Sequence, residues 1–354
     1  MKRPSLSNSS LRWTLGLALV GLALACPLVL YGESALDAVT AEVGKVFEKT
    51  APAVVKIRSI DKLEPLAGTG FFIDSKGTIL TSVSIIRDAY KAWVEYQKRE
   101  IPALVVSRDF RSGVALLRIE AKNTPFLSLG NSDELKTASS IISVAYPYNL
   151  PAAPAFGIVS GFDVQYLNRF FATTHIRANI AVSPGQIGGP LLNSQGKVVG
   201  LMVMAIDEGK GCYALPSNSA SKIIADIAKY GEAQHGWVGV GVMQEEAKAK
   251  QGGIVRVSQL FEGAPAVGSG ITTGDRVLKI GQREISQPSD VLDAAFFSKV
   301  GEKVAVLVER DGKKVAFDMQ VKKRPDQSRP VEATARPIFM PKNDEVVRVK
   351  GTAP

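Results

Sequence analysis

The sequence predicts a mainly β protein with two folded units, and three observations support this prediction. The chain has 354 residues, which at roughly 150 residues per domain corresponds to about two domains. Between residues 53 and about 211, short β-rich segments alternate with Gly, Pro and Asn, as is typical of a sandwich or barrel and not of a parallel α/β sheet. Between about 236 and 321, a second series of strands closes with a hairpin whose turn is Asp311-Gly312.

The first unit is bounded by two amphipathic helices. Apolar residues recur at spacings of three and four from 34 to 50, where Pro52 ends the helix, and again from 217 to 230, where Gly231 ends it. The expected strands between these helices are 54–60, 70–73, 78–82, 92–96, 104–107, 114–119, 141–146, 157–163 and 198–204.

The second unit is short but long enough to fold alone, at roughly 85 residues. Its expected elements are strands at 253–257 and 276–280, a helix at 289–297 and a hairpin of 304–309 with 315–321. The predicted domain boundaries are 1–32 for a signal peptide or membrane anchor, 33–232 and 233–323 for the two folded units, and 324–354 for a disordered basic tail.

The amino terminus has the layout of a secretory signal or a membrane anchor. Lys2, Arg3 and Arg12 precede nineteen uncharged residues, 13–31. Three fates stay open: a cleaved signal peptide, a retained anchor, and lipid attachment at Cys26. In each case the protein leaves the cytoplasm, so we expect it in the periplasm, secreted, or anchored in the cell membrane and facing outward, with membrane contact only through this segment.

Composition excludes several classes of function. Of the net charge of +9, three charges lie before residue 33 and four after residue 321, which leaves only +2 on the folded part. A nucleic-acid footprint on a folded face is therefore not supported. Two histidines and two cysteines are too few for a zinc cluster or a disulfide framework. We expect no cofactor and no metal.

Nine short motifs occur in an order that resembles the HtrA/DegP family of secreted, trypsin-like serine proteases, over about residues 35–321. The resemblance implies a trypsin-like double β-barrel followed by a PDZ domain. The motifs are Pro52-Ala53-Val54-Val55, Gly68-Thr69-Gly70-Phe71-Phe72-Ile73, Thr78-Ile79-Leu80-Thr81, Ala115-Leu116-Leu117, Leu129-Gly130-Asn131-Ser132, Gly157-Ile158-Val159-Ser160, Ser183-Pro184-Gly185-Gln186-Ile187-Gly188-Gly189-Pro190-Leu191, Leu215-Pro216-Ser217-Asn218 and Gly236-Trp237-Val238-Gly239-Val240.

The chemistry of that family needs a serine nucleophile, a histidine base and an orienting aspartate. At the matching positions this chain has Ser84 for the histidine, Gly113 for the aspartate and Ile187 for the serine. Loss of the nucleophile or the base costs on the order of 10⁶ in turnover in a related mechanism. The resemblance therefore leaves no catalytic residue in place, and we predict a pseudoprotease that is not an enzyme.

No other residue is an evident substitute. His175 is expected to be a core or rim histidine, Asp109 a solvated turn aspartate and His235 part of an exposed linker. Ser183 has no identifiable base, and Cys212 is expected to be a small buried apolar side chain.

Two backbone segments are expected to contact peptide. Gly185, Gln186 and Ile187 would retain the backbone of the family's oxyanion loop, although the glycines here and at Gly188-Gly189 could simply preserve a barrel turn. An extended peptide could also add to an exposed strand edge of the second barrel. By the resemblance, the carboxylate-binding loop of the PDZ domain consists of Trp237, Val238, Gly239 and Val240, and the helix opposite presents Val291, Ala295 or Phe296.

Three hypotheses follow. The leading one is an inactive HtrA homologue that binds polypeptides or protein C-termini, as a chaperone, a scaffold or a regulator of an active HtrA-type protease, and in this family a homotrimer is implied. The enzyme alternative is an active serine-type endopeptidase or other hydrolase with a rearranged nucleophile, Ser84 or Cys212. The third assigns the barrel a structural role, displaying the PDZ domain and the tail to a membrane or cell-wall polyanion.

Overall fold

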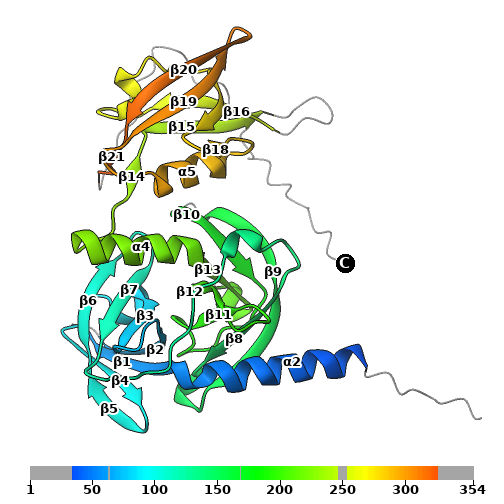
Figure 1. Cartoon of the computed structure of the whole chain (residues 1–354), viewed down its shortest axis with the longest axis vertical. Helices are drawn as coiled ribbons and strands as arrows, with labels where there is room; N and C mark the ends of the chain where they lie inside the picture. Colours follow the sequence, from blue (N-terminus) through cyan, green and yellow to red (C-terminus); the bar gives the residue numbers. More distant parts are fainter. Residues whose placement is uncertain (1–33, 63, 168, 246–252, 326–354) are drawn as a thin grey trace, which may run out of the picture. The chain divides into compact units, whose positions relative to one another are not determined.

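A computed structural model describes residues 34–62, 64–167, 169–245 and 253–325 (Figure 1). The predicted signal or anchor segment, Cys26 within it and most of the predicted tail lie outside these residues. In the part that is described, no helix is long and apolar enough to cross a membrane. The fold is mainly β, as the sequence predicts.

The first β unit is a seven-stranded antiparallel sheet with the strand order β5-β4-β1-β2-β3-β7-β6. Strand β1 shows why these residues form it, because buried Val55 and Ile57 alternate with the more exposed Lys56 and Arg58. The strands are β1 (Val54–Ile60), β2 (Pro65–Phe72), β3 (Thr78–Ser82), β4 (Lys91–Tyr96), β5 (Arg99–Pro102), β6 (Leu104–Asp109) and β7 (Val114–Arg118).

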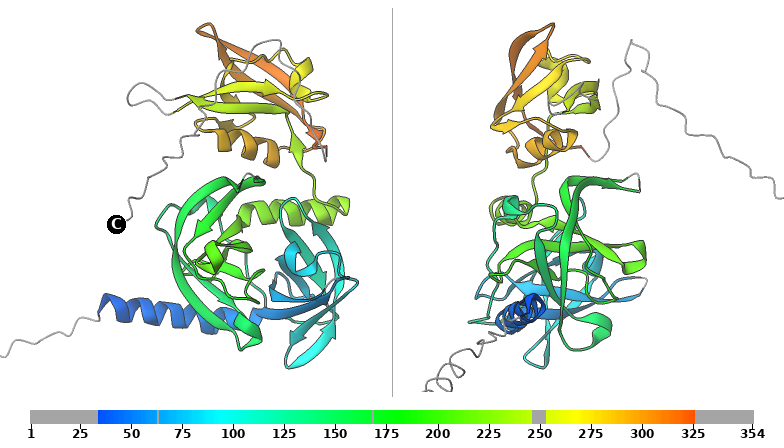
Figure 2. Two further views of the ribbon diagram at one scale, coloured as in Figure 1. Left: turned by 180° about the vertical axis from the view of Figure 1, so that it is seen from behind. Right: turned by 90° about the vertical axis from the view of Figure 1, so that its right-hand side faces the viewer.

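The second β unit is a closed barrel with the strand order β10-β13-β12-β11-β8-β9. Closure leaves no unpaired strand at the ends of this ladder. Its longest strands, β9 and β10, pair as an antiparallel hairpin (Figure 2). The strands are β8 (Ser140–Ala145), β9 (Ala153–Tyr166), β10 (Arg169–Ala178), β11 (Pro190–Leu192), β12 (Val198–Ile206) and β13 (Gly211–Pro216).

The predicted helices at 34–50 and 217–230 are confirmed as α2 (Ala35–Thr50) and α4 (Ser217–Tyr230). Helix α4 buries Ala220, Ile223 and Ile227 on one face. It ends at Gly231, whose φ of 79° lets its N–H donate to the carbonyl of Ile227. A further one-turn helix, α3 (Val83–Ile86), follows β3.

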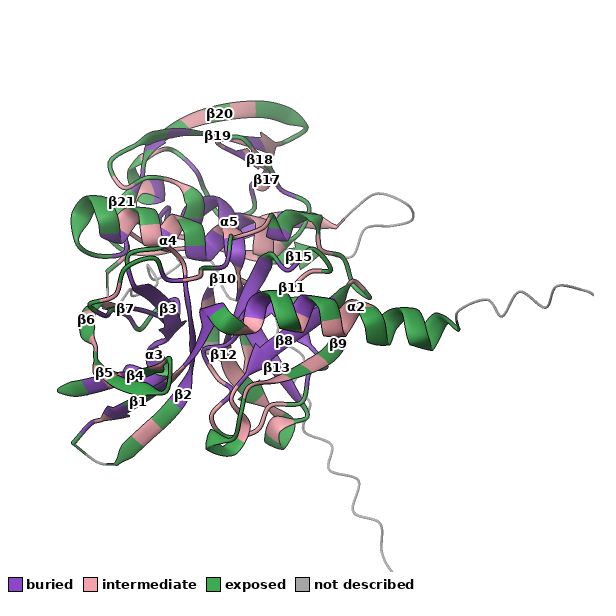
Figure 3. Ribbon diagram, turned by 60° about the horizontal axis from the view of Figure 1, so that its bottom comes forward, coloured by how far each residue is buried: buried purple, intermediate pink, exposed green. Residues whose placement is uncertain are grey.

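A shared hydrophobic core joins the two β units. Phe71 and Leu80 of the first sheet and Val144 and Leu201 of the barrel belong to one buried cluster. The strands that carry them, β2, β3, β8 and β12, all have stretches coloured as buried in Figure 3. Each fully buried side chain of this size contributes about 1.5–3 kcal/mol, so the cluster holds the facing loops of the two units in fixed positions.

The C-terminal unit has its own core and a sheet with the order β15-β16-β17-β19-β20, in which β18 pairs with β17. The predicted hairpin is confirmed, and Asp311 and Gly312 both have positive φ, as a two-residue primed turn requires. The elements are β14 (Gly236–Trp237), β15 (Val240–Glu245), β16 (Ile254–Leu260), β17 (Arg276–Ile280), β18 (Arg283–Glu284), α5 (Pro288–Phe297), β19 (Lys303–Arg310), β20 (Lys313–Gln320) and β21 (Lys322–Lys323).

Candidate functional site

Ser84, at the position expected for a histidine, lies on the short helix α3. The hydroxyl of Ser82 accepts a hydrogen bond from the Ser84 N–H at 3.2 Å and lies 2.8 Å from Ser84 Oγ. The Ser84 side chain is exposed. Neither histidine contacts it, since His175 bonds to a backbone carbonyl and His235 to a carboxylate. No imidazole is therefore placed to activate this hydroxyl.

Gly113, at the position expected for an aspartate, is held in a conformation that suits glycine. Its φ is +80°, and its carbonyl accepts a hydrogen bond from the N–H of Val83 at 2.8 Å. A Cβ added here would lie 3.3 Å from Cγ1 of Val203, a residue of β12. Both the backbone and Val203 would have to adjust before a carboxylate could occupy this position.

Ile187, at the position expected for the nucleophile, lies in a tight turn that the structure preserves. Its carbonyl accepts a hydrogen bond from the N–H of Thr69 at 2.9 Å, and its partly buried side chain packs against the core of the first sheet. The flanking Gly185 and Gly188 have φ of +94° and +87°. A Cβ on Gly188 would lie 2.1 Å from the carbonyl oxygen of Thr69, so only glycine fits there.

The same turn presents two unused backbone donors. Gln186 is buried, and its N–H donates to the carbonyl of Ser183 at 3.2 Å. By contrast, the N–H groups of Gly185 and Ile187 donate to no residue within the described ranges. Two N–H groups separated by one residue, free of internal partners, can receive a carbonyl or carboxylate oxygen.

The loop 237–240 combines rigidity with free donors. Gly239 has a φ of +72°, and a Cβ there would lie 2.0 Å from the Cβ of Ala264, so this position requires glycine. The carbonyls of Val238 and Gly239 accept hydrogen bonds from Ala266 and Phe261 at 3.2 and 3.1 Å. Their N–H groups donate to nothing in the described part of the chain. The loop leads directly into β15, an edge strand with one unpaired side.

Helix α5 runs beside β15 (Figure 1), but its side chains differ from the expectation. Val291 and Ala295 are buried in the core of the C-terminal unit. Phe296 is 2% exposed and belongs to the core cluster of the β units, with Nζ of Lys222 4.9 Å from its ring centre. These three residues were expected to face a ligand; the structure buries them because they also form the contacts that hold α5 in place.

The structure reveals a pair that sequence reasoning missed. His235 Nε2 lies 2.9 Å from Asp109 Oδ2, and their side chains are only 11% and 10% exposed. Ser112 Oγ also donates to this carboxylate. The expectations of an exposed linker histidine and a solvated turn aspartate were therefore wrong. The two residues are 126 positions apart, and no local pattern connects them.

Electrostatics agree with this geometry. Burial raises the pKa of Asp109, but the hydrogen bond and charge of His235, together with the hydrogen bond from Ser112, outweigh burial and hold that pKa below its ordinary value of 3.8. Asp109 is thus an ionised, buried carboxylate.

The two other candidates for a base or a nucleophile, His175 and Cys212, are buried and uncharged at neutral pH. His175 stacks on Phe171 at 4.2 Å, and burial lowers its pKa to about 4, as expected of a core histidine. Cys212 is fully buried, and burial raises its pKa to about 12, so it carries no thiolate at neutral pH. Within the described ranges, no group of three His, Cys, Asp or Glu residues is placed to hold a metal ion.

Two families match the chain in succession. Residues 68–201 match the trypsin-like peptidase domain, and residues 236–321 match the PDZ domain. The fold and site therefore define a trypsin-like domain followed by a PDZ domain, as the order of motifs predicts.

Relatives of known sequence and of known structure support the same order of domains. A probable periplasmic serine endoprotease, DegP-like, of Pseudomonas putida is 32% identical over 271 residues, which is 73% of this chain and 56% of that protein. A protein of the same description in Chlamydia pneumoniae is 29% identical, and the match again covers 56% of that protein. The HtrA-type protease AlgW with tripeptide is a structural neighbour, with a TM-score of 0.69, 25% identity and coverage of 80% of this chain and 98% of that one.

The chain is a homologue of the HtrA-type serine proteases with a PDZ domain. It spans about half the length of the curated relatives it matches. The prediction that the protein is not an enzyme is contradicted, because these relatives are named serine endoproteases. The physical reason is that the residue types at three aligned positions describe those positions alone. The groups of a Ser-His-Asp type of site are recognised by their geometry and their roles, not by their place in the sequence.

Proposed function

We propose that this HtrA homologue binds polypeptides, and that the loop Trp237, Val238, Gly239 and Val240 receives a C-terminal carboxylate. The observation that carries the proposal is the pair of N–H groups on Val238 and Gly239 that have no partner in the described part of the chain. Backbone N–H groups that converge on an anion form charge-assisted hydrogen bonds, which are about twice as strong as neutral ones.

The adjoining strand supplies the rest of the binding mode. Strand β15 is the edge of its sheet, so its outer N–H and C=O groups are open to a further strand. A peptide whose carboxylate sits at Gly239 would extend along β15 and pair with it, next to α5. Partly buried Val240 and Val242 would provide apolar contact for alternate side chains of the peptide.

The trypsin-like domain would offer a second contact. The free N–H groups of Gly185 and Ile187 can receive a peptide carbonyl, with buried Gln186 holding the turn. In this proposal Ser84, Gly113 and Ile187 do not form a Ser-His-Asp triad. Any peptidase activity, which the names of the relatives indicate, would then use other groups of the chain.

We further propose that the protein acts outside the cytoplasm and assembles with other proteins. Relatives are named periplasmic, which supports action outside the cytoplasm. Bound polypeptides would serve a chaperone-like, scaffolding or regulatory role. The assembly partners would be an active HtrA-type protease and further copies of this chain, which would form a homotrimer.

Peptides with and without a free C-terminal carboxylate test the role of the loop directly. Fluorescence anisotropy with the whole chain would measure binding of a library of labelled peptides that differ only in a free or an amidated C-terminus. Loss of the carboxylate should weaken binding about 10-fold or more, since hydrogen bonds to charged groups contribute about 1.5–3 kcal/mol. Equal binding of both peptide forms would overturn the role of the loop.

A second measurement addresses the three triad positions. Cleavage of unfolded casein would be followed for the unmodified chain and for Ser84→Ala. We expect the two proteins to cleave at equal rates, because Ser84 has no base. A rate lost only in Ser84→Ala would identify Ser84 as the nucleophile and contradict this part of the proposal.

A further inference from the structure

The loop 147–150, which connects β8 and β9, exposes two large apolar side chains. Tyr148 is 64% exposed and Leu150 is 57% exposed. Neither belongs to a hydrophobic core cluster of the described residues, and the Tyr148 hydroxyl has no hydrogen-bond partner among them. Single exposed apolar residues are common, but these two lie two positions apart and beside the turn 185–187.

Hydrogen bonds fix the loop against this turn. The N–H of Tyr148 donates to the carbonyl of Pro184 at 2.7 Å, and Nζ of Lys56 donates to the carbonyl of Asn149 at 3.2 Å. A Cβ added to Gly185 would lie 3.5 Å from the nitrogen of Tyr148 and 3.7 Å from that of Asn149. The loop and the turn are therefore in contact, backbone against backbone.

Two residues of the loop have left-handed backbone conformations. The φ angle is 50° at Tyr148 and 62° at Asn149. A bulky residue such as tyrosine rarely adopts this conformation, and residues that do so cluster at ligand-binding sites where the surrounding structure fixes them. The exposed position of the Tyr148 side chain is thus set by a constrained backbone.

The groups around the loop define the chemistry of a ligand. The N–H groups of Gly185 and Ile187 have no partner in the described part of the chain, so they can receive a carbonyl oxygen. Residues 146–152 carry no charge, and the ammonium of Lys56 is already paired with Glu95 at 3.2 Å. An extended polypeptide offers both a carbonyl oxygen and an adjacent apolar side chain, whereas a hydrocarbon chain would leave both donors unpaired.

We propose that the loop 147–150 and the turn 185–187 together bind an extended polypeptide segment that carries a large apolar side chain. A peptide carbonyl lies on the N–H groups of the turn, and the apolar side chain packs against Tyr148 and Leu150. This inference rests on the proposed second contact of the trypsin-like domain. It adds the class of segment that this contact prefers, which is one with the aromatic or aliphatic residues that unfolding exposes.

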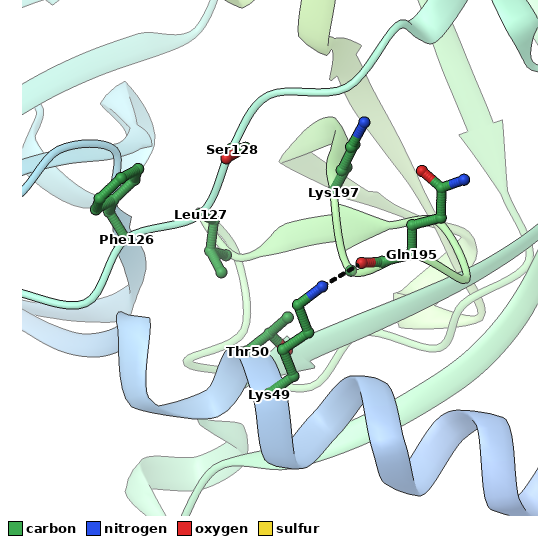
Figure 4. Close-up of a pocket in the computed structure, with 8 residues that line it drawn as sticks. Lys49, Thr50, Phe126, Leu127, Ser128, Gln195 and Lys197 are labelled. Atoms are coloured by element: carbon green, nitrogen blue, oxygen red, sulfur yellow. Dashed lines mark hydrogen bonds between the residues drawn. The ribbon is translucent and has the colours of Figure 1, made fainter.

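The pocket at the end of α2 does not offer the same convergence (Figure 4). Nζ of Lys49 donates to the carbonyl of Gln195 at 2.7 Å, whereas the side chain of Lys197 points away from Lys49. The ring of Phe126 is directed away from both lysines. The polar and apolar groups of that pocket therefore do not face one ligand.

The probe is a fluorescent peptide that is capped at both ends, so that it has no carboxylate for the loop 237–240. Three versions carry Phe, Ala or Asp at the central position, and fluorescence anisotropy measures their binding to the whole chain. The Phe version should bind about 10-fold more tightly than the Ala version, the factor expected when part of a phenyl group is buried. The Asp version should bind most weakly.

Tyr148→Ala should weaken binding of the Phe version about 5-fold, the loss expected for one aromatic contact, and leave the Ala version nearly unchanged. Tyr90→Ala is the matched control, because Tyr90 is a tyrosine of almost the same exposure, 65%, whose N–H donates to the carbonyl of Ile60 at the end of β1. This variant should bind the Phe version as the unmodified chain does. Both tyrosines are exposed, so the variants should fold, and thermal melting would verify this.

Three outcomes would overturn the inference: no saturable binding of the Phe version, equal binding of the Phe and Ala versions, or equal losses in Tyr148→Ala and Tyr90→Ala. None of them affects the role of the loop 237–240, because capped peptides do not test it. Conversely, peptides with free and amidated C-termini could bind equally while the capped Phe version still depends on Tyr148. In that case the role of the loop 237–240 fails and this inference stands.

Discussion

His235 Nε2 lies 2.9 Å from Asp109 Oδ2, and this contact ties the segment after α4 to the last residue of β6. Ser112 donates to the same carboxylate, and the ring centre of Phe296 lies 5.9 Å from that of His235. Such a buried carboxylate is stabilising only while all of its partners stay in place.

Removal of this carboxylate should destabilise the fold. We expect Asp109→Asn to lower the free energy of unfolding by about 1–3 kcal/mol at pH 7, as measured by urea denaturation. Asp207→Asn is the control, since the carboxylate of Asp207 is exposed and forms an ion pair with the exposed Lys210. A change of similar size in both variants would contradict the importance of the pair.

The same residue should make stability depend on pH. Because the pKa of Asp109 is lowered in the folded state, its stabilisation is fully present above the ordinary value of 3.8 and is lost as the pH falls through the lower, folded value. The difference in unfolding free energy between the unmodified chain and Asp109→Asn should therefore shrink as the pH falls below about 4. A constant difference between pH 7 and pH 3 would argue against an ionised Asp109.

Gly239 should be far less tolerant of substitution than its neighbour Gly263. Both have positive φ, but a Cβ on Gly239 would collide with Ala264, whereas a Cβ on Gly263 meets nothing within 4 Å. Gly263→Ala should cost about 1–2 kcal/mol of stability, the backbone term alone. Gly239→Ala should cost more and also weaken peptide binding. Thermal melting and anisotropy on both variants would separate the two effects.

Installing the family's triad should require a fourth substitution. Ser84→His, Gly113→Asp and Ile187→Ser supply the side chains, but Val203 crowds position 113. A shift of about 1 Å in a catalytic group can cost about 100-fold in rate. We therefore expect Val203→Ala to raise casein cleavage by the triple variant about 10-fold or more. Val203→Ala alone should give no increase, and equal rates with and without it would contradict the crowding argument.

Cys212 should be unreactive in the folded protein. Its burial raises the pKa to about 12, and thiolate is the reactive form. A thiol-directed probe should label Cys212 readily only after denaturation. In the folded chain at pH 8, the labelling rate should be more than 100-fold below that of a free cysteine. Rapid labelling of the folded chain at this residue would instead favour the rearranged-nucleophile hypothesis.

Much of the fold was predictable from sequence because its signals are local. The helix 217–230 and the hairpin around Asp311-Gly312 follow from apolar spacing and turn chemistry, and both are confirmed. The loop at Gly239 was predicted only through the resemblance, and the positive φ of Gly239 in the structure explains why glycine stands there. The prediction that the chain is not an enzyme is contradicted by its relatives, which are named serine endoproteases, because the residue types at three motif positions do not by themselves decide activity.

The sequence by itself determined the order of the β units, the PDZ domain and the side chains at 84, 113 and 187. Only the tertiary structure decided that His235 binds Asp109 and that Val203 fills the space beside Gly113. The reason is physical. Periodicity and turn preferences act between residues a few positions apart, whereas these contacts join segments far apart in the chain and exist only once the core has packed.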